Sequence, residues 1–144
     1  MDLAYELHDL VRTLDRQADQ MLRGHDLTYN RFVTLVIASE HPGMTGRQLA
    51  RAVGISEPAM SAIVRFLLDA GLIDDDAGER AGNVRRIRVT AAGIQRLGEA
   101  RDALGDSLSQ TARRLGIDAD DLAATIHRLH GALHDSPTPR EERP

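Results

Sequence analysis

Cysteine, lysine and tryptophan are absent from this 144-residue sequence, and only 3% of its residues are aromatic. The absence of cysteine excludes disulfides, thiolate metal sites, cysteine nucleophiles and thiol-based redox sensing. With so few aromatic residues, the core must be built from Leu, Ile, Val, Ala and Met, which suits helix packing better than a β-sandwich. We therefore expect a mainly helical protein.

Long apolar runs are also absent. No run approaches the roughly 20 residues that a membrane-spanning helix needs, and no basic stretch followed by an apolar core marks an export signal at the N-terminus. The length favours one domain. These features predict a soluble, globular, cytoplasmic protein with no membrane partner.

Positive charge is in short supply, because 18 basic residues, all arginine, face 22 acidic residues and give a formal net charge of −4. A chain with this balance repels nucleic acid on average. The charge is unevenly distributed, however. Residues 45–90 contain seven arginines and six acids and carry +1, whereas the remainder, with 11 arginines and 16 acids, carries −5. Positive charge is therefore concentrated in the middle of the chain.

Apolar spacing predicts the first two helices. Apolar residues spaced by three and four between Leu3 and Met21 form the stripe of an amphipathic helix over about 2–23. Thr28 is suited to cap a second helix, which ends at His41-Pro42-Gly43. The predicted buried positions of this second helix are Phe32, Leu35, Val36 and Ser39.

The next segment has the pattern of a helix-turn-helix. Thr45 can cap a helix that ends at Gly54, and Ser56 follows almost at once as the cap of another helix over about 57–70. Gly71 ends that helix. Two helices joined by a tight, glycine-containing turn are typical of the helix-turn-helix motif.

A hairpin is predicted after this motif. Leu72-Ile73 and Ile87–Val89 bracket a polar, glycine-bearing stretch at 74–83, which is typical of a two-stranded wing. Thr90 can then cap a long helix that ends at Gly116. The predicted apolar face of this helix is Ile94, Leu97, Leu104, Leu108 and Leu115, and Gly98 and Gly105 inside it indicate close helix packing.

The last predicted helix begins at Asp118. Its apolar stripe is Leu122, Ile126, Leu129 and Leu133. Residues 135–144 are rich in Pro and charge, and we expect them to form a disordered tail.

The order of these elements and several short motifs resemble the multiple-antibiotic-resistance regulator (MarR) family of bacterial transcription factors. The motifs are Thr45-x-x-Gln48-Leu49-Ala50-x-x-Val53-Gly54-Ile55-Ser56, Ser61-x-Ile63-Val64-x-x-Leu67, Ala70-Gly71-Leu72-Ile73 and Val89-Thr90-Ala91-Ala92-Gly93. The resemblance covers nearly the whole chain. It implies a winged helix-turn-helix fold, mainly α with a small β-wing and with N- and C-terminal dimerisation helices.

The resemblance also implies an organisation and a function. Residues 1–134 are expected to form one domain, with the winged helix-turn-helix lobe at about 28–90 and dimerisation helices at about 2–23 and 91–134. The chain is expected to form a homodimer. This homodimer is expected to bind a pseudo-palindromic operator in double-stranded DNA and to repress transcription.

The residues of the motif support DNA binding independently. A helix with small and polar residues at its N-terminal end can approach base edges in the major groove, and arginines on a wing can contact phosphates or enter a narrow minor groove. The predicted DNA-binding residues are Thr45, Arg47, Gln48, Ser56, Glu57, Pro58, Ala59, Ser61, Arg65, Arg80, Arg85, Arg86 and Arg88. The alternatives are a helix pair used only for packing and wing arginines that are merely solvated.

Two positions depart from the family pattern. The family commonly has Asp-x-Arg about seven residues before the Leu/Val-Thr pair that opens the post-wing helix, whereas this sequence has Ala81-Gly82-Asn83. Ala62 stands where arginine is common. Arg80 and Arg85 are therefore the candidates to enter the minor groove, and we expect few base-specific contacts.

Many relatives release DNA when a small aromatic or phenolic compound enters a crevice between the dimerisation helices and the DNA-binding lobe. Arginines near the first two helices can hold an acidic aromatic effector by charge-assisted hydrogen bonds. The candidate residues are Arg12, Arg16, Tyr29 and Arg31, and the alternative for each is an ordinary surface role.

A metal site and an enzyme are the remaining classes. His127, His130 and His134 have helical spacing that suits metal ligation, but no carboxylate or cysteine completes a metal signature. We therefore predict a histidine row that is solvated or lies at the edge of an interface, with no metal and no cofactor. The sequence has no Gly-rich phosphate loop, His-Glu-x-x-His motif or nucleophile elbow, so we predict no catalysis.

The remaining alternative is a winged-helix module that contacts proteins and does not read an operator. Salt-dependent DNA binding separates the two, because neutralising phosphates makes binding weaken steeply with salt.

Replacing Arg80 or Arg85 with alanine is expected to weaken operator binding in gel shifts by about tenfold or more, because one of them is predicted to enter the minor groove. Near-wild-type affinity of both variants would contradict the insertion hypothesis.

Overall fold

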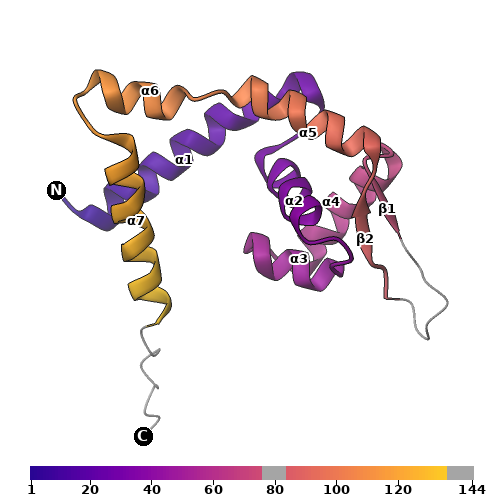
Figure 1. The fold of residues 1–144 in the computed structure, drawn as a ribbon. Helices are drawn as coiled ribbons and strands as arrows, with labels where there is room; N and C mark the ends of the chain where they lie inside the picture. Colours follow the sequence, from indigo (N-terminus) through magenta and orange to yellow (C-terminus); the bar gives the residue numbers. More distant parts are fainter. Residues whose placement is uncertain (76–83, 136–144) are drawn as a thin grey trace, which may run out of the picture. The chain divides into compact units, whose positions relative to one another are not determined.

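The computed structural model describes residues 1–75 and 84–135, and the chain divides into two compact units, Met1–Gly105 and Asp106–Pro144 (Figure 1). Arg80 and the rest of the expected wing tip, and residues 136–144 of the expected tail, lie outside the described residues. The first unit has the element order helix, helix, helix, helix, hairpin, helix. Its bounds are α1 Leu3–Leu22, a 3-10 turn η1 Arg23–His25, α2 Tyr29–Glu40, α3 Gly46–Val53, α4 Glu57–Asp69, β1 Ile73–Asp75, β2 Ile87–Val89 and α5 Ala91–Leu104.

The second unit contains α6 Ser107–Arg114 and α7 Ala119–His134, which contact each other. Asp106 precedes α6, and hydrogen bonding from Ser109, followed by Arg113, lowers the pKa of its carboxyl. In the described part of the chain, no helix is both long and apolar enough to cross a membrane.

Short polar side chains begin the helices at the predicted positions. The side-chain oxygens of Thr28, Thr45, Ser56, Thr90 and Asp118 each accept a hydrogen bond from the backbone N–H three residues later. Each bond satisfies a donor that the first turn of a helix leaves without a partner. The predicted helix starts are therefore confirmed.

Helix α2 lies at the centre of the first unit and contacts α1, α3, α4, α5 and β2. Its predicted buried set is partly wrong, because Thr34, Leu35 and Ala38 are buried while the other three predicted residues are only half-buried. Thr34 can be buried because its hydroxyl donates to the carbonyl of Asn30 at 2.7 Å. The three predicted residues that are only half-buried are Phe32, Val36 and Ser39.

The predicted long helix after the wing is broken at Gly105. Helix α5 ends at Leu104, and Gly105 has φ 57° and ψ −153°, a backbone conformation that only glycine adopts readily. Helix α6 then starts at Ser107. The expected close packing at Gly98 is also wrong, since nothing lies within 4 Å of a Cβ built there.

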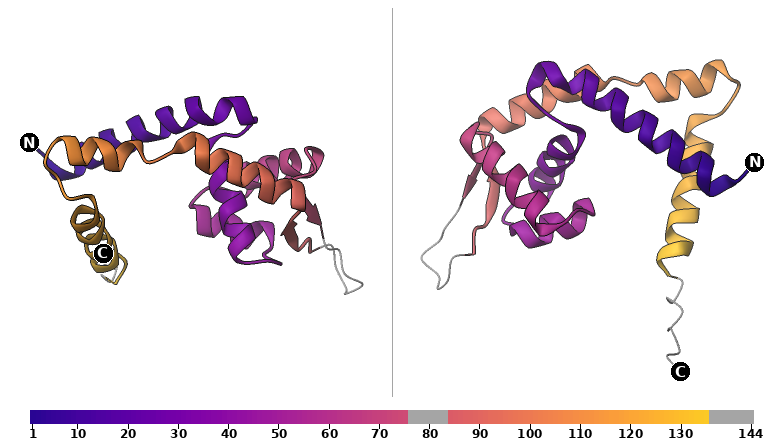
Figure 2. Two further views of the ribbon diagram at one scale, coloured as in Figure 1. Left: turned by 45° about the horizontal axis from the view of Figure 1, so that its top comes forward. Right: turned by 180° about the vertical axis from the view of Figure 1, so that it is seen from behind.

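The hairpin is antiparallel and pairs Ile73 with Val89 and Asp75 with Ile87. Strand β2 is also bonded to the segment before α3, because Ile87 N–H donates to the Met44 carbonyl at 2.9 Å and Gly43 N–H donates to the Ile87 carbonyl at 2.9 Å. Strands β1 and β2 lie side by side at the edge of the group formed by α2, α3 and α4, as both views in Figure 2 show. The wing is thus fixed at its base from two sides.

A close junction joins the end of α4, the wing and the start of α5. Thr90 donates through its backbone N–H to the Leu72 carbonyl at 3.1 Å and through its hydroxyl to the Gly71 carbonyl at 2.7 Å. Gly93 is buried there, and a Cβ at this position would lie 2.1 Å from the Leu72 carbonyl oxygen and 2.6 Å from Val89 Cγ1. No side chain fits between α5 and the wing at this point.

Replacing Gly93 with alanine is expected to lower the free energy of unfolding by about 1–3 kcal/mol, because backbone must move to admit the methyl group. The matched control is Gly98→Ala in the same helix, which meets no neighbour and is expected to raise it by about 0.5–1 kcal/mol. Urea unfolding at one fixed protein concentration measures both. Equal unfolding midpoints for the two variants would contradict the close contact between Gly93 and the Leu72 carbonyl.

Candidate nucleic-acid interface

Helices α3 and α4 form the predicted helix-turn-helix. Gly54 ends α3 with φ 80°, in the left-handed region that favours glycine, and Ile55 N–H donates to the Ala50 carbonyl at 3.0 Å. Ser56 then caps α4 through a 3.2 Å bond from Ala59 N–H. Three residues, Gly54, Ile55 and Ser56, therefore redirect the chain from one helix into the next.

One face of α4 is buried and the other is free. The buried side chains of α4 are Met60, Val64 and Leu67. The exposed residues at its start and along its outer face are Glu57, Pro58, Ala59, Ser61, Ala62 and Arg65. Most of these are small, so the N-terminal half of α4 presents backbone and short side chains to whatever approaches it.

The predicted residues of α3 have local partners. Thr45 and Gln48 form a capping box, in which the Thr45 hydroxyl accepts from Gln48 N–H at 3.2 Å and the Gln48 amide oxygen accepts from Thr45 N–H at 2.9 Å. Arg47 Nε donates to Glu57 Oε1 at 2.7 Å, and both side chains are exposed. The structure therefore brings Arg47 and Glu57 together across the turn.

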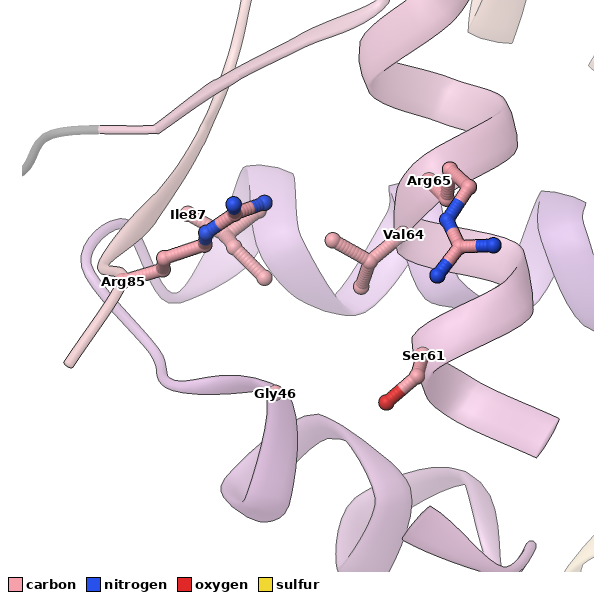
Figure 3. Close-up of a pocket in the computed structure, with 6 residues that line it drawn as sticks. All are labelled: Gly46, Ser61, Val64, Arg65, Arg85 and Ile87. Atoms are coloured by element: carbon pink, nitrogen blue, oxygen red, sulfur yellow. The ribbon is translucent and has the colours of Figure 1, made fainter. Parts of the chain in front are cut away.

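A cavity of about 340 Å³ lies between α4 and the base of the wing (Figure 3). It is lined by Gly46, Ser61, Val64, Arg65, Arg85 and Ile87. Arg85 reaches toward α4 from the segment before β2, while Arg65 and Ser61 come from α4 itself (Figure 3). Two positive side chains and one hydroxyl therefore share a concave site beside the exposed face of α4.

The wing arginines within the described part have separate partners. Arg85 Nε lies 3.2 Å from Asp75 Oδ2, and Arg86 donates to the Gly43 carbonyl at 3.2 Å. Arg88 lies near the same turn, since a Cβ built at Gly43 would be 3.8 Å from its Nη2. Arg86 and Arg88 are exposed while Ile87 between them is buried, as strand alternation predicts.

The predicted effector residues lie on α1 and α2. Arg12 is exposed, Arg16 donates to Thr13 Oγ1 at 3.4 Å, and the Tyr29 ring lies 6.2 Å from the Phe32 ring. The Arg31 guanidinium stacks 3.5 Å from the centroid of Phe66 on α4. Neither the cavity beside α4 nor the groove described next is lined by any of these four residues, and their role stays a prediction.

Sequence reasoning missed a second, more open groove of about 540 Å³. It is lined by Ile37, His41, Met44, Gln48, Arg51 and Ala52, from the end of α2, the following turn and α3. One of its lining residues, Met44, is paired with Ile87, and the two residues are far apart in the sequence. No local pattern signals such a contact.

The predicted histidine row lies on α7, where the rings of His130 and His134 are 5.3 Å apart. Within residues 1–75 and 84–135, no group of three or more His, Asp or Glu side chains is placed to hold a metal ion.

A family model described as the MarR family matches residues 27–75, which include the helix-turn-helix and β1. The HTH-type transcriptional repressor Rv2887 of Mycobacterium tuberculosis is 31% identical over 91 residues. Residues 27–75 of this chain therefore match the MarR family. The match with Rv2887 covers 63% of this chain and 66% of the repressor, just under two thirds of its length.

Solved structures of the MarR family share the fold. A mutant MarR of E. coli, complexed with operator DNA, has a TM-score of 0.76 at 18% identity, covering 91% of this chain and 93% of that one. Rv2887 of M. tuberculosis, complexed with salicylic acid, has a TM-score of 0.70 at 24% identity, covering 92% and 96%. The predicted winged helix-turn-helix fold is therefore confirmed. Rv2887 is named as a transcriptional repressor, which agrees with the prediction of a regulator rather than an enzyme.

Replacing Ser56 with alanine is expected to cost about 1 kcal/mol of stability, because Ala59 N–H loses its acceptor at the start of α4. Ser61→Ala is the matched control, since its exposed hydroxyl caps nothing, and it is expected to change stability by less than about 0.5 kcal/mol. Thermal and urea unfolding measure both variants. A Ser61 variant as unstable as the Ser56 variant would contradict the assignment of the cap.

Proposed function

We propose that this chain is a cytoplasmic, homodimeric transcriptional repressor of the MarR family that binds a pseudo-palindromic operator through α4 and the wing. The observation that carries the proposal is the exposed, small-residue face of α4 beside a cavity that holds Arg65 and Arg85. The proposal retains one domain over residues 1–134, with a winged helix-turn-helix lobe at about 28–90.

The face of α4 supports major-groove binding. Pro58, Ala59 and Ser61 leave room for base edges to approach the helix, while Met60 and Val64 anchor the opposite face in the core. Arg65 and Arg85 supply positive charge at the side of this face, where the phosphate backbone of a bound duplex would pass. Affinity then comes mainly from the arginines, and sequence information from the few polar groups on α4.

Exposed apolar side chains support a dimer. On α1, Leu3, Tyr5 and Val11 have relative exposures of 65%, 67% and 52%. On α7, the predicted stripe Leu122, Ile126, Leu129 and Leu133 is 42–75% exposed, and none of the 16 residues of this helix is buried. Apolar faces of this extent favour association, so a second copy of the chain is proposed to cover them.

A small aromatic or phenolic effector is proposed to release the DNA. Rv2887, a relative of this chain, has been solved in complex with salicylic acid. The candidates that would hold such an acid remain Arg12, Arg16, Tyr29 and Arg31, of which Tyr29 and Arg31 lie in the first turn of α2.

Binding to DNA is tested by selection from a pool of random duplexes, followed by fluorescence anisotropy over a range of salt concentrations. Wild-type protein is expected to enrich a pseudo-palindrome, and log affinity is expected to fall linearly with log salt concentration. Arg65→Ala should weaken binding and reduce the salt slope by about 1, because one phosphate contact is lost.

The matched control is Arg101→Ala, since Arg101 lies in the last turn of α5 and does not line the cavity beside α4. It is expected to keep the wild-type salt slope. No enrichment and no salt-dependent binding would instead support the alternative, a winged-helix module that contacts proteins.

A further inference from the structure

Glu57 is an unusual residue for a surface that meets DNA. It is the first residue of α4, its side chain is 57% exposed, and its charge repels phosphate. Its neighbours on the exposed face, Pro58, Ala59 and Ala62, carry no side-chain hydrogen-bonding group. In the first turn of α4, Glu57 is thus the one side chain able to accept a hydrogen bond from a base.

Arg47 holds this carboxylate in place from the neighbouring helix. Its Nε donates to Glu57 Oε1 at 2.7 Å across the turn between α3 and α4. Among the described residues, Glu57 Oε2 accepts no side-chain hydrogen bond. The pair therefore offsets the negative charge of Glu57 with one oxygen and leaves the other oxygen available as an acceptor.

Helical geometry aligns Glu57 with other polar residues of α4. Glu57, Ser61 and Arg65 are spaced by four residues, so they lie in one row along the outer face of the helix. Ser61 and Arg65 line the cavity beside the wing. The row therefore runs from an acceptor at the helix start to a positive group two turns later.

We propose that Glu57 is a specificity-determining residue that accepts a hydrogen bond from the N4 amino group of a cytosine, and that Arg47 is its positioning residue. This inference rests on the proposed function. In the major groove, guanine presents the acceptors N7 and O6 and thymine presents O4, all of which repel a carboxylate, and adenine places the acceptor N7 beside its amino group. Cytosine presents only a donor there, so a carboxylate favours it.

Two purely structural roles make a different prediction. An exposed ion pair contributes little to stability, and an acid in the first turn of a helix interacts favourably with the helix dipole. If Glu57 had only one of these roles, replacing it would change the stability of the protein or its affinity for all duplexes alike. Neither role gives a preference for one base pair, so the base preference is the decisive readout.

The experiment compares duplex selection by the full-length wild-type chain with selection by Glu57→Gln. Wild type is expected to enrich a cytosine at one position in each half-site, and Glu57→Gln to enrich adenine there, since glutamine pairs with adenine N6 and N7. Anisotropy on duplexes that differ only at this pair should show the preference for cytosine over adenine changing by about tenfold or more.

Two further variants separate position from charge. Arg47→Ala should reduce the preference for cytosine several-fold without creating one for adenine, because the carboxylate remains but is no longer held. Asp69→Asn removes an equal charge at the far end of α4, where Asp69 is exposed, and should leave the consensus unchanged.

An unchanged consensus for Glu57→Gln, or a uniform gain of affinity for all duplexes, overturns the assignment and leaves DNA binding intact. A wild-type chain that enriches no sequence and shows no salt-dependent binding overturns the proposed function and this inference together.

Discussion

The contact between Gly93 and the Leu72 carbonyl is the constraint on which the rest of the first unit depends. A side chain at Gly93 would collide with backbone, so only glycine lets the start of α5 lie directly against the junction of α4 and β1. Thr90 completes this junction, because it caps α5 and also bonds the carbonyls of Gly71 and Leu72. The end of α4 and the end of β2 are therefore held together at this junction. The junction thereby sets the distance between α4 and the wing.

The chain is acidic overall, but two acidic side chains near α4 are paired with arginines. This local pairing makes the net charge compatible with DNA binding. Arg47 neutralises Glu57, Asp75 holds Arg85, and Arg65 lies beside the cavity at the base of the wing. Asp75 also has a buried Oδ1 that accepts no hydrogen bond within the described part of the chain. Phosphate would compete with Asp75 for Arg85, so binding is expected to rearrange an existing ion pair rather than order a loose side chain.

Much of the fold could be predicted because its signals are local. Thr45, Ser56 and Thr90 each cap a helix through an N–H three residues away, which requires no tertiary information. The break at Gly105 was not predicted, since Leu104 and Leu108 continue the apolar spacing across it and spacing says nothing about backbone conformation. Candidate site residues could be named from the sequence, but the contacts between residues could not. Arg47 and Glu57, like Met44 and Ile87, come together only when the helix-turn-helix and the wing pack.

Hydroxyl-radical footprinting on the duplex most enriched by the wild-type chain tests the central claim most directly. Two copies of α4 related by a two-fold axis predict two equivalent protected regions whose centres are about one helical turn apart, with further protection where each wing follows the backbone. A single protected region would contradict a dimer that binds DNA through α4 and the wing. So would the absence of protection at a protein concentration at which the duplex is bound.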